Sequence, residues 1–330
     1  MKQVSPGYIF KSLVAAALLH AGSVNAFTPA PAPLNVGGQV EPNVMFILDD
    51  SGSTEWAYMP DDLKGSFSRT ACTQEARSGD NYWYNCTETG HRYLYSSAMN
   101  SVYYDPSETY AAPPGFNNAI YTAARLDGYN SSSPTVNLST SFRMIMHRDA
   151  YTNGRMDYFY AGSARQAFYY RQNAGCVGSK ADSCYTRVNI PSGQQVNFAN
   201  WFSYYRTRMM AAKAGTISAF HPQTKAIRVG YGTINSASRP VDGTATTSII
   251  RGVRPFEGTD RTAFLNWIRD AQANGPTPLR RALDDAGKYF SRTDQRGPWS
   301  TTPGSTGGQE YSCRQNYTIL TTDGYWNDAQ

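Results

Sequence analysis

The chain has 330 residues, of which 40% are hydrophobic and 17% are charged, a composition that can bury a globular core. Its formal net charge is +5, and without the two lysines of the first 26 residues it has 28 basic and 25 acidic residues, or +3. This small excess excludes the charge footprint of a nucleic-acid-binding protein. No run of Lys and Arg is long enough to indicate a membrane-surface protein.

Residues 1–26 have the pattern of a signal peptide. Lys2 and Lys11 precede the short apolar stretch at 13–19, and small residues at 24–26 suit cleavage by a signal peptidase. The apolar stretch is too short to span a bilayer, although a buried amino-terminal helix is an alternative. A Pro/Gly-rich linker is predicted at 27–40 and the folded domain at 41–330. We therefore expect an exported protein without a membrane span.

A buried strand is predicted at 44–48, and it ends in the motif Asp-x-Ser-x-Ser. Asp49, Ser51 and Ser53 place one carboxylate and two hydroxyl groups on a tight loop. Oxygen ligands of this kind suit a hard divalent cation such as Mg²⁺. The motif alone is short enough to occur by chance, and the alternative is a solvated turn.

A long segment at 54–197 separates this strand from the next confident element. It is rich in Tyr, Ser, Asn and Gly and contains four of the five cysteines. Its aromatic residues form either the core of an inserted lobe or a surface that binds protein or sugar. Because the segment directly follows the Asp-x-Ser-x-Ser loop, we expect it to lie at the rim of the site.

The cysteines indicate disulfides rather than a zinc site. Cys72 and Cys86, and Cys176 and Cys184, are close pairs in polar sequence, and their spacing does not match zinc ligands. The connectivity cannot be deduced from sequence, and Cys313 is left over.

The rest of the chain alternates helical and strand patterns. One helix is predicted at 198–220, strands at 226–234 and 246–253, and a short helix near 264–268. A loop containing Thr277 opens a helical pattern at 279–290, and a last strand at 317–322 runs into Asp323.

Two predicted strands thus end in an acid. Because the carboxyl ends of parallel strands meet at one edge of a sheet, their polar side chains are expected to gather there. The predicted metal site consists of Asp49, Ser51, Ser53, Thr277 and Asp323.

These five positions resemble the metal-ion-dependent adhesion site of the von Willebrand factor A domain. The resemblance implies a Rossmann-like α/β fold of three layers, α/β/α, interrupted by the large insertion. It also implies that Asp49, the two serines and Thr277 approach the ion directly or through water, and that Asp323 supports it through water. A partner's carboxylate would complete the coordination. The favoured ion is Mg²⁺, with Mn²⁺ and Ca²⁺ left open.

A closer resemblance, in four segments from about residue 40 to 330, is to the amino-terminal half of the PilY/PilC family. The segments are NSVYYDP (100–106), NFANWFSYYRTRM (197–209), TPLRRAL (277–283) and CRQNYTILTTDGYWN (313–327). Members of this family are type IV pilus assembly proteins and tip-associated adhesins of Gram-negative bacteria.

This resemblance implies a role in type IV pilus biogenesis and in adhesion at the pilus tip. The implied partners are minor pilins or the pilus tip, and a receptor on a host cell or an abiotic surface. The implied route is export through the periplasm to the cell surface, with outer-membrane association left open. The family's sheet needs further strands after residue 324, so the carboxyl end is expected to be truncated.

Two other classes of function are alternatives. A carbohydrate-binding surface protein would use the Tyr-rich insertion. A metal-assisted hydrolase would use the ion to activate water. It lacks a recognisable motif, because His91, His147 and His221 are the histidines that remain after signal removal and none lies in an HExxH arrangement. We therefore expect no enzyme.

Overall fold

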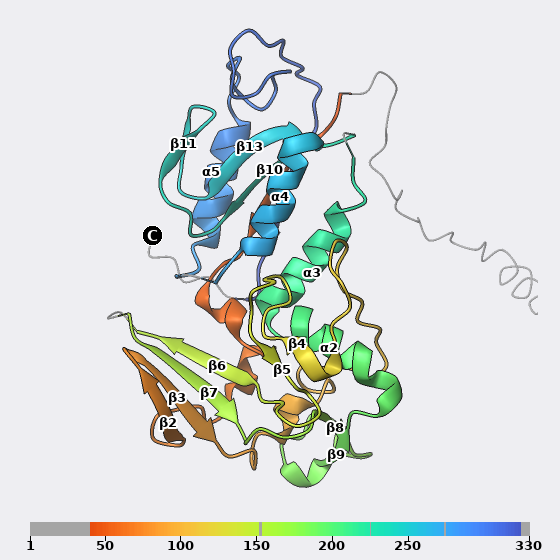
Figure 1. Cartoon of the computed structure of the whole chain (residues 1–330). Helices are drawn as coiled ribbons and strands as arrows, with labels where there is room; N and C mark the ends of the chain where they lie inside the picture. Colours follow the sequence, from red (N-terminus) through yellow and green to blue (C-terminus); the bar gives the residue numbers. More distant parts are fainter. Residues whose placement is uncertain (1–39, 152–153, 225, 274, 325–330) are drawn as a thin grey trace, which may run out of the picture. The chain divides into compact units, whose positions relative to one another are not determined.

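The computed structural model describes residues 40–151, 154–224, 226–273 and 275–324 (Figure 1). The predicted signal peptide at 1–26, and the predicted linker at 27–40 except its last residue, therefore lie outside the described residues.

A four-stranded sheet is built around the first strand. Its order is β13-β10-β1-β14, and the strands are β1 (Asn43–Leu48), β10 (Arg228–Thr233), β13 (Ile249–Pro255) and β14 (Asn316–Thr321). Strands β10 and β14 both pair with β1 in parallel, and β13 runs antiparallel to β10. The four strands predicted from sequence for this part of the chain are thereby confirmed, with bounds that differ by a few residues.

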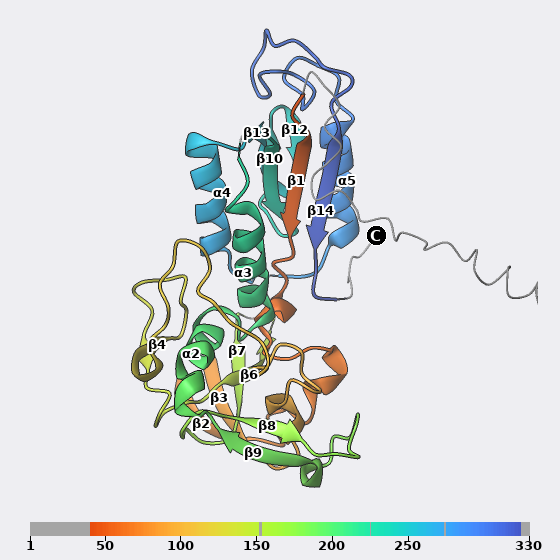
Figure 2. The same ribbon diagram turned by 90° about the vertical axis from the view of Figure 1, so that its right-hand side faces the viewer.

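Helices cover both faces of this sheet (Figure 2). Helices α3 (Arg208–Phe220) and α4 (Gly258–Asp270) lie on one face and α5 (Leu279–Phe290) lies on the other. Because side chains alternate along a strand, Phe46 packs against the first pair of helices and Ile47 packs with α5. The predicted α/β class is confirmed, and the assignment to the von Willebrand factor A fold stays a prediction.

The insertion contains a second four-stranded sheet in the order β2-β3-β7-β6. Its strands are β2 (Thr73–Ser78), β3 (Asn81–Cys86), β6 (Ile145–Ala150) and β7 (Met156–Ala161). Three two-stranded ladders complete the strands: β4 (Ala124–Arg125) with β5 (Thr135–Val136), β8 (Phe168–Gln172) with β9 (Tyr185–Asn189), and β11 (Arg239–Val241) with β12 (Thr244–Thr246), the last of which lies beyond the insertion.

The aromatic residues of the insertion mainly form its core. Tyr93, Tyr95, Tyr103 and Tyr104 are at most 3% exposed and belong to one hydrophobic cluster. Trp201 joins this cluster and packs edge-on against Tyr103. Others, including Trp83 and Tyr158, keep part of their surface exposed. The burial of so many rings favours the interpretation of the aromatic residues as a core.

The prediction of one helix at 198–220 is wrong. The structure has α2 (Gln195–Tyr204) and α3, separated by a break at 205–207. Thr207 has an extended backbone, and its side chain accepts a hydrogen bond from the Met210 N–H at 3.3 Å, so it caps α3. The apolar spacing continues through the break because α2 packs in the core of the insertion and α3 packs on the central sheet.

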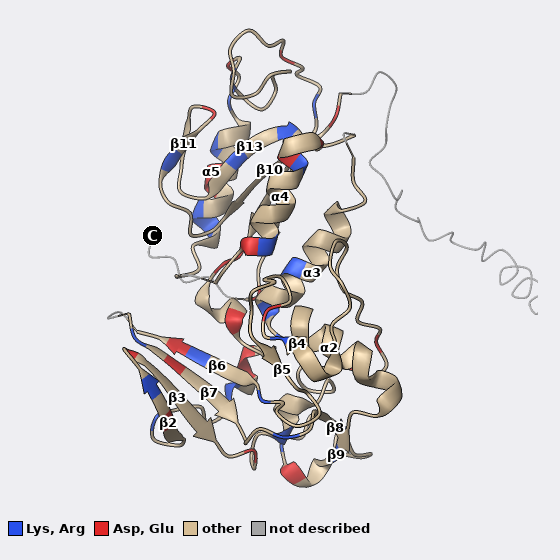
Figure 3. Ribbon diagram, viewed as in Figure 1, with Lys and Arg blue, Asp and Glu red and all other residues tan. Residues whose placement is uncertain are grey.

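Both predicted cysteine pairs form disulfides, Cys72–Cys86 and Cys176–Cys184. Cys313 is exposed and is not in a disulfide. Among the described residues, no helix combines the length and the apolar character needed to cross a membrane. Basic and acidic residues are interspersed along the ribbon (Figure 3).

Candidate metal site

The Asp-x-Ser-x-Ser loop begins where β1 leaves the sheet. The Asp49 N–H donates to the carbonyl oxygen of Thr321 at 3.0 Å, which continues the pairing with β14. The Gly52 N–H donates to the carbonyl oxygen of Gly275 at 3.1 Å and so joins this loop to the one that contains Thr277. Asp49 and Ser51 are 3% and 1% exposed. Backbone contacts therefore position the loop before any ligand is considered.

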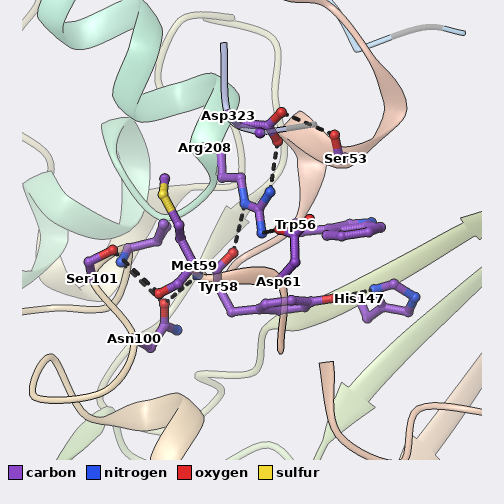
Figure 4. Close-up of polar contacts among 12 residues, drawn as sticks. Ser53, Trp56, Tyr58, Met59, Asp61, Asn100, Ser101, His147, Arg208 and Asp323 are labelled. Atoms are coloured by element: carbon purple, nitrogen blue, oxygen red, sulfur yellow. Dashed lines mark hydrogen bonds and ion pairs between the residues drawn. The ribbon is translucent and has the colours of Figure 1, made fainter. Parts of the chain in front are cut away.

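Four of the five predicted residues are linked by hydrogen bonds. The Ser51 N–H donates to Asp49 Oδ1 at 2.8 Å, and Ser51 Oγ lies 3.1 Å from Ser53 Oγ. Ser53 Oγ donates to Asp323 Oδ1 at 3.1 Å (Figure 4). The ends of β1 and β14 thus bring together two carboxylates and two hydroxyl groups, as their sequence pattern predicted.

Thr277 lies on the same cavity as Ser53 and Asp323. This cavity has a volume of about 360 Å³, and the insertion contributes Trp56 and Asp61 to its wall. The insertion therefore borders the candidate site. Thr277 is 6% exposed.

Sequence reasoning missed two residues at the site. Thr322 Oγ1 donates to Asp49 Oδ2 at 2.7 Å, which orients the carboxylate. Arg208 donates from Nη1 to Asp323 Oδ2 at 2.9 Å (Figure 4). Arg208 lies within the segment that was predicted as one helix at 198–220, and the helical pattern alone does not indicate an acid partner for it. Thr322 could have been considered, since it directly precedes a predicted ligand.

Burial raises the pKa of Asp323, and the neighbouring charge of Asp49 raises it further. Arg208 and the Ser53 hydroxyl act in the opposite direction, because both stabilise the ionised carboxylate. The carboxylates of buried Asp49 and partly buried Asp323 thus repel each other, and a cation bound near them would relieve this repulsion.

The chemistry of the donors fits a hard cation. No group of three or more His, Cys, Asp and Glu suited to a metal occurs in the part of the chain that the structure describes. An ion at this edge would therefore depend on hydroxyl groups beside its carboxylates. Such a set suits Mg²⁺, Mn²⁺ or Ca²⁺ and not zinc, which prefers nitrogen and sulfur ligands.

Comparison with known proteins identifies close relatives along nearly the whole chain. The chain is 33% identical over 345 residues to the type IV pilus biogenesis factor PilY1 of Pseudomonas aeruginosa strain PAK. The aligned region covers 97% of this chain and 27% of that protein. The proteins of the same name from strains PAO1 and UCBPP-PA14 are each 31% identical, over 97% and 92% of this chain.

No family model matches the chain, and no solved structure matches it. The chain spans about a quarter of the length of the curated relatives it matches. Since the likeness extends over at least 92% of this chain in all three, the resemblance predicted from the four sequence segments is confirmed. The chain therefore belongs to the PilY/PilC family.

Proposed function

We propose that this chain acts in type IV pilus biogenesis and in adhesion at the pilus tip, through a divalent cation held by a von Willebrand factor A-like domain. Support for the pilus role comes from the family, whose three compared members are named type IV pilus biogenesis factors. The observation that carries the metal role is the Ser53–Asp323 hydrogen bond, which joins two motifs 270 positions apart.

The arrangement of the central sheet supports the proposed fold. Strand β1 lies between two parallel neighbours, and helices cover both faces of the sheet. The candidate residues gather beyond the carboxyl ends of the parallel strands, where open α/β sheets usually bind their ligands.

In this proposal some residues hold the ion and others orient the residues that hold it. Asp49, Ser51, Ser53 and Thr277 hold the ion, and Thr322 orients the Asp49 carboxylate. Asp323 orients the Ser53 hydroxyl group through its hydrogen bond. The bound ion supplies an open coordination position for a carboxylate of the partner.

Binding is a better proposal than catalysis. His147 is fully buried and lies between Tyr58 and Asp149, at 2.8 and 2.9 Å. His91 is 5% exposed and contacts the backbone oxygen of Thr87 at 2.8 Å. Both histidines are thus engaged within the insertion and are poorly placed to move protons at the metal site.

The proposed partners are minor pilins or the pilus tip, and a host-cell or abiotic surface receptor. The proposed location is the cell surface, reached through the periplasm. The alternative of a carbohydrate-binding insertion has weaker support, because most of the rings that suggested it are buried.

Complementation of a bacterium that lacks its own copy of the gene tests this proposal. Pilus number and surface attachment are measured with the wild type, with Asp49→Ala, and with Asp260→Asn as a control at the partly exposed ion pair of Arg251 with Asp260. We expect attachment to fail with Asp49→Ala, and chelation followed by Mg²⁺ to abolish and restore it in the wild type. Full attachment with Asp49→Ala would refute the metal role. Binding to a glycan array that survives chelation would favour the carbohydrate alternative.

A further inference from the structure

Arg208 connects the candidate metal site to the insertion. This first residue of α3 has a side chain that is 2% exposed. Its Nη1 donates to Asp323 at 2.9 Å, its Nη2 donates to Asp61 Oδ1 at 2.6 Å, and its Nε donates to the carbonyl oxygen of Tyr58 at 2.7 Å (Figure 4). One guanidinium group thus holds the end of β14 and two points of the insertion together.

The surroundings of Arg208 favour a positive charge. Its Cζ lies 5.1 Å from the ring of Trp56 and 5.6 Å from the ring of Tyr58, within the range of cation–π attraction. Asp61 and Asp323 supply two carboxylates. The guanidinium group therefore already serves as a resident cation at this edge.

Asp323 has both carboxylate oxygens engaged. Oδ1 accepts the Ser53 hydroxyl and Oδ2 accepts Arg208. A divalent ion supported by Asp323 would be attracted to the same carboxylate that forms the ion pair with Arg208. The ion and the guanidinium group would also repel each other, because both are positively charged.

We propose that Arg208 is a positioning residue of the metal site, which holds Asp323 as its counter-ion and competes with the divalent cation for that carboxylate. This inference rests on the proposed function. Coupling between two interactions at one carboxylate is reciprocal. Arg208 lowers the affinity of the site for the ion by some factor, and the bound ion weakens the Arg208–Asp323 ion pair by the same factor. Occupancy of the site is thereby coupled to how firmly the insertion is held at the end of β14.

Titration calorimetry of the full chain with Mg²⁺ tests the competition. Arg208→Met keeps an unbranched side chain and removes the charge, and we expect it to bind Mg²⁺ at least about tenfold more tightly than the wild type. Arg208→Lys keeps the charge and should return the affinity towards that of the wild type. Arg206→Met is the matched control, because Arg206 contacts the backbone oxygens of Phe202 and Leu126.

Hydrogen exchange of the wild-type chain gives a readout that does not need a variant. With saturating Mg²⁺, the amides at 56–63 are expected to exchange faster, because the link from Arg208 to Asp323 is weakened. This measurement decides the matter if Arg208→Met does not fold, since unchanged exchange at 56–63 would overturn the proposal.

If the wild type binds Mg²⁺ measurably and folded Arg208→Met binds it equally or more weakly, the proposed competition is overturned. The proposed metal site itself would then stand. Tighter binding by Arg208→Met would support it even if the wild type bound too weakly to measure. No binding by either protein would overturn the proposed function together with this inference.

Discussion

Replacement of Asp49 by Asn separates the charge of this residue from its hydrogen bonds. In the structure the carboxylate accepts the Ser51 N–H at 2.8 Å and the Thr322 hydroxyl at 2.7 Å. The Asn oxygen can still accept the Ser51 N–H, and its amide can donate to Thr322 Oγ1. The free energy of unfolding of the metal-free protein should therefore change by about 1 kcal/mol or less.

The affinity for the ion should change much more. Asp49 is one of the two carboxylates among the predicted site residues, and loss of one partner of a buried charge pair costs about 2–5 kcal/mol. This range corresponds to a dissociation constant for Mg²⁺ that is about 30- to 4,000-fold higher. Asp49→Ala differs in that it leaves the buried Ser51 N–H without its acceptor, which costs about 1–3 kcal/mol of stability in addition.

Calorimetric titration with Mg²⁺ and Mn²⁺, paired with thermal unfolding in a chelator, measures the two effects separately. Asp260→Asn provides an acid-to-amide control at a partly exposed position in the first turn of α4. An affinity of Asp49→Asn equal to that of the wild type would refute the assignment of Asp49 as a ligand. A large loss of metal-free stability would show that its charge has a structural role instead.

Three further outcomes are expected. Thr277→Val removes a hydroxyl group and keeps the shape of the side chain, so calorimetry should show Mg²⁺ binding weakened by about tenfold. The melting temperature of the metal-free protein should stay nearly unchanged, and a marked drop in that temperature would make Thr277 structural. Asn100→Ala should cost about 3–5 kcal/mol in urea unfolding, because this buried side chain makes four hydrogen bonds to backbone groups of the insertion; a loss below 1 kcal/mol would contradict this. Burial lowers the pKa of His147, so the unfolded chain takes up a proton near pH 6.5 before the folded chain does, and stability is lost as the pH falls below this value. The melting-temperature gap between the wild type and His147→Gln should therefore narrow from pH 7.5 to 5, and a constant gap would refute the role of His147.

The central sheet was predictable because β1 is a continuous apolar run and the other three strands are short segments rich in β-branched and aromatic residues. Strand β1 is buried on both faces, so no alternation was needed to recognise it. The grouping of Asp49 with Asp323 followed from the same rule, because both acids directly follow or nearly follow a strand. Local sequence and topology were sufficient for this part of the site.

The insertion was less predictable because its pairing depends on distant segments. Strand β2 is exposed at every position and has no apolar face, and its partner β3 is a short aromatic-rich run. Arg208 has acid partners that lie 147 and 115 positions away, Asp61 and Asp323. No local pattern can indicate such contacts, since they arise only when the insertion packs against the sheet.

Strand β1 comes first in the chain but lies between β10 and β14 in the sheet, and this has a consequence for the order of folding. Its pairing with β10 and β14 joins residues 185 and 273 positions apart, whereas the insertion has its own core and two disulfides that close short loops. Closing a long loop is slow and costs more chain entropy, so the insertion should fold first while β1 waits for its neighbours. The metal site, which needs β14, would be completed last. A mutation that prevents β14 from pairing should then abolish metal binding and leave a folded, disulfide-bonded insertion behind.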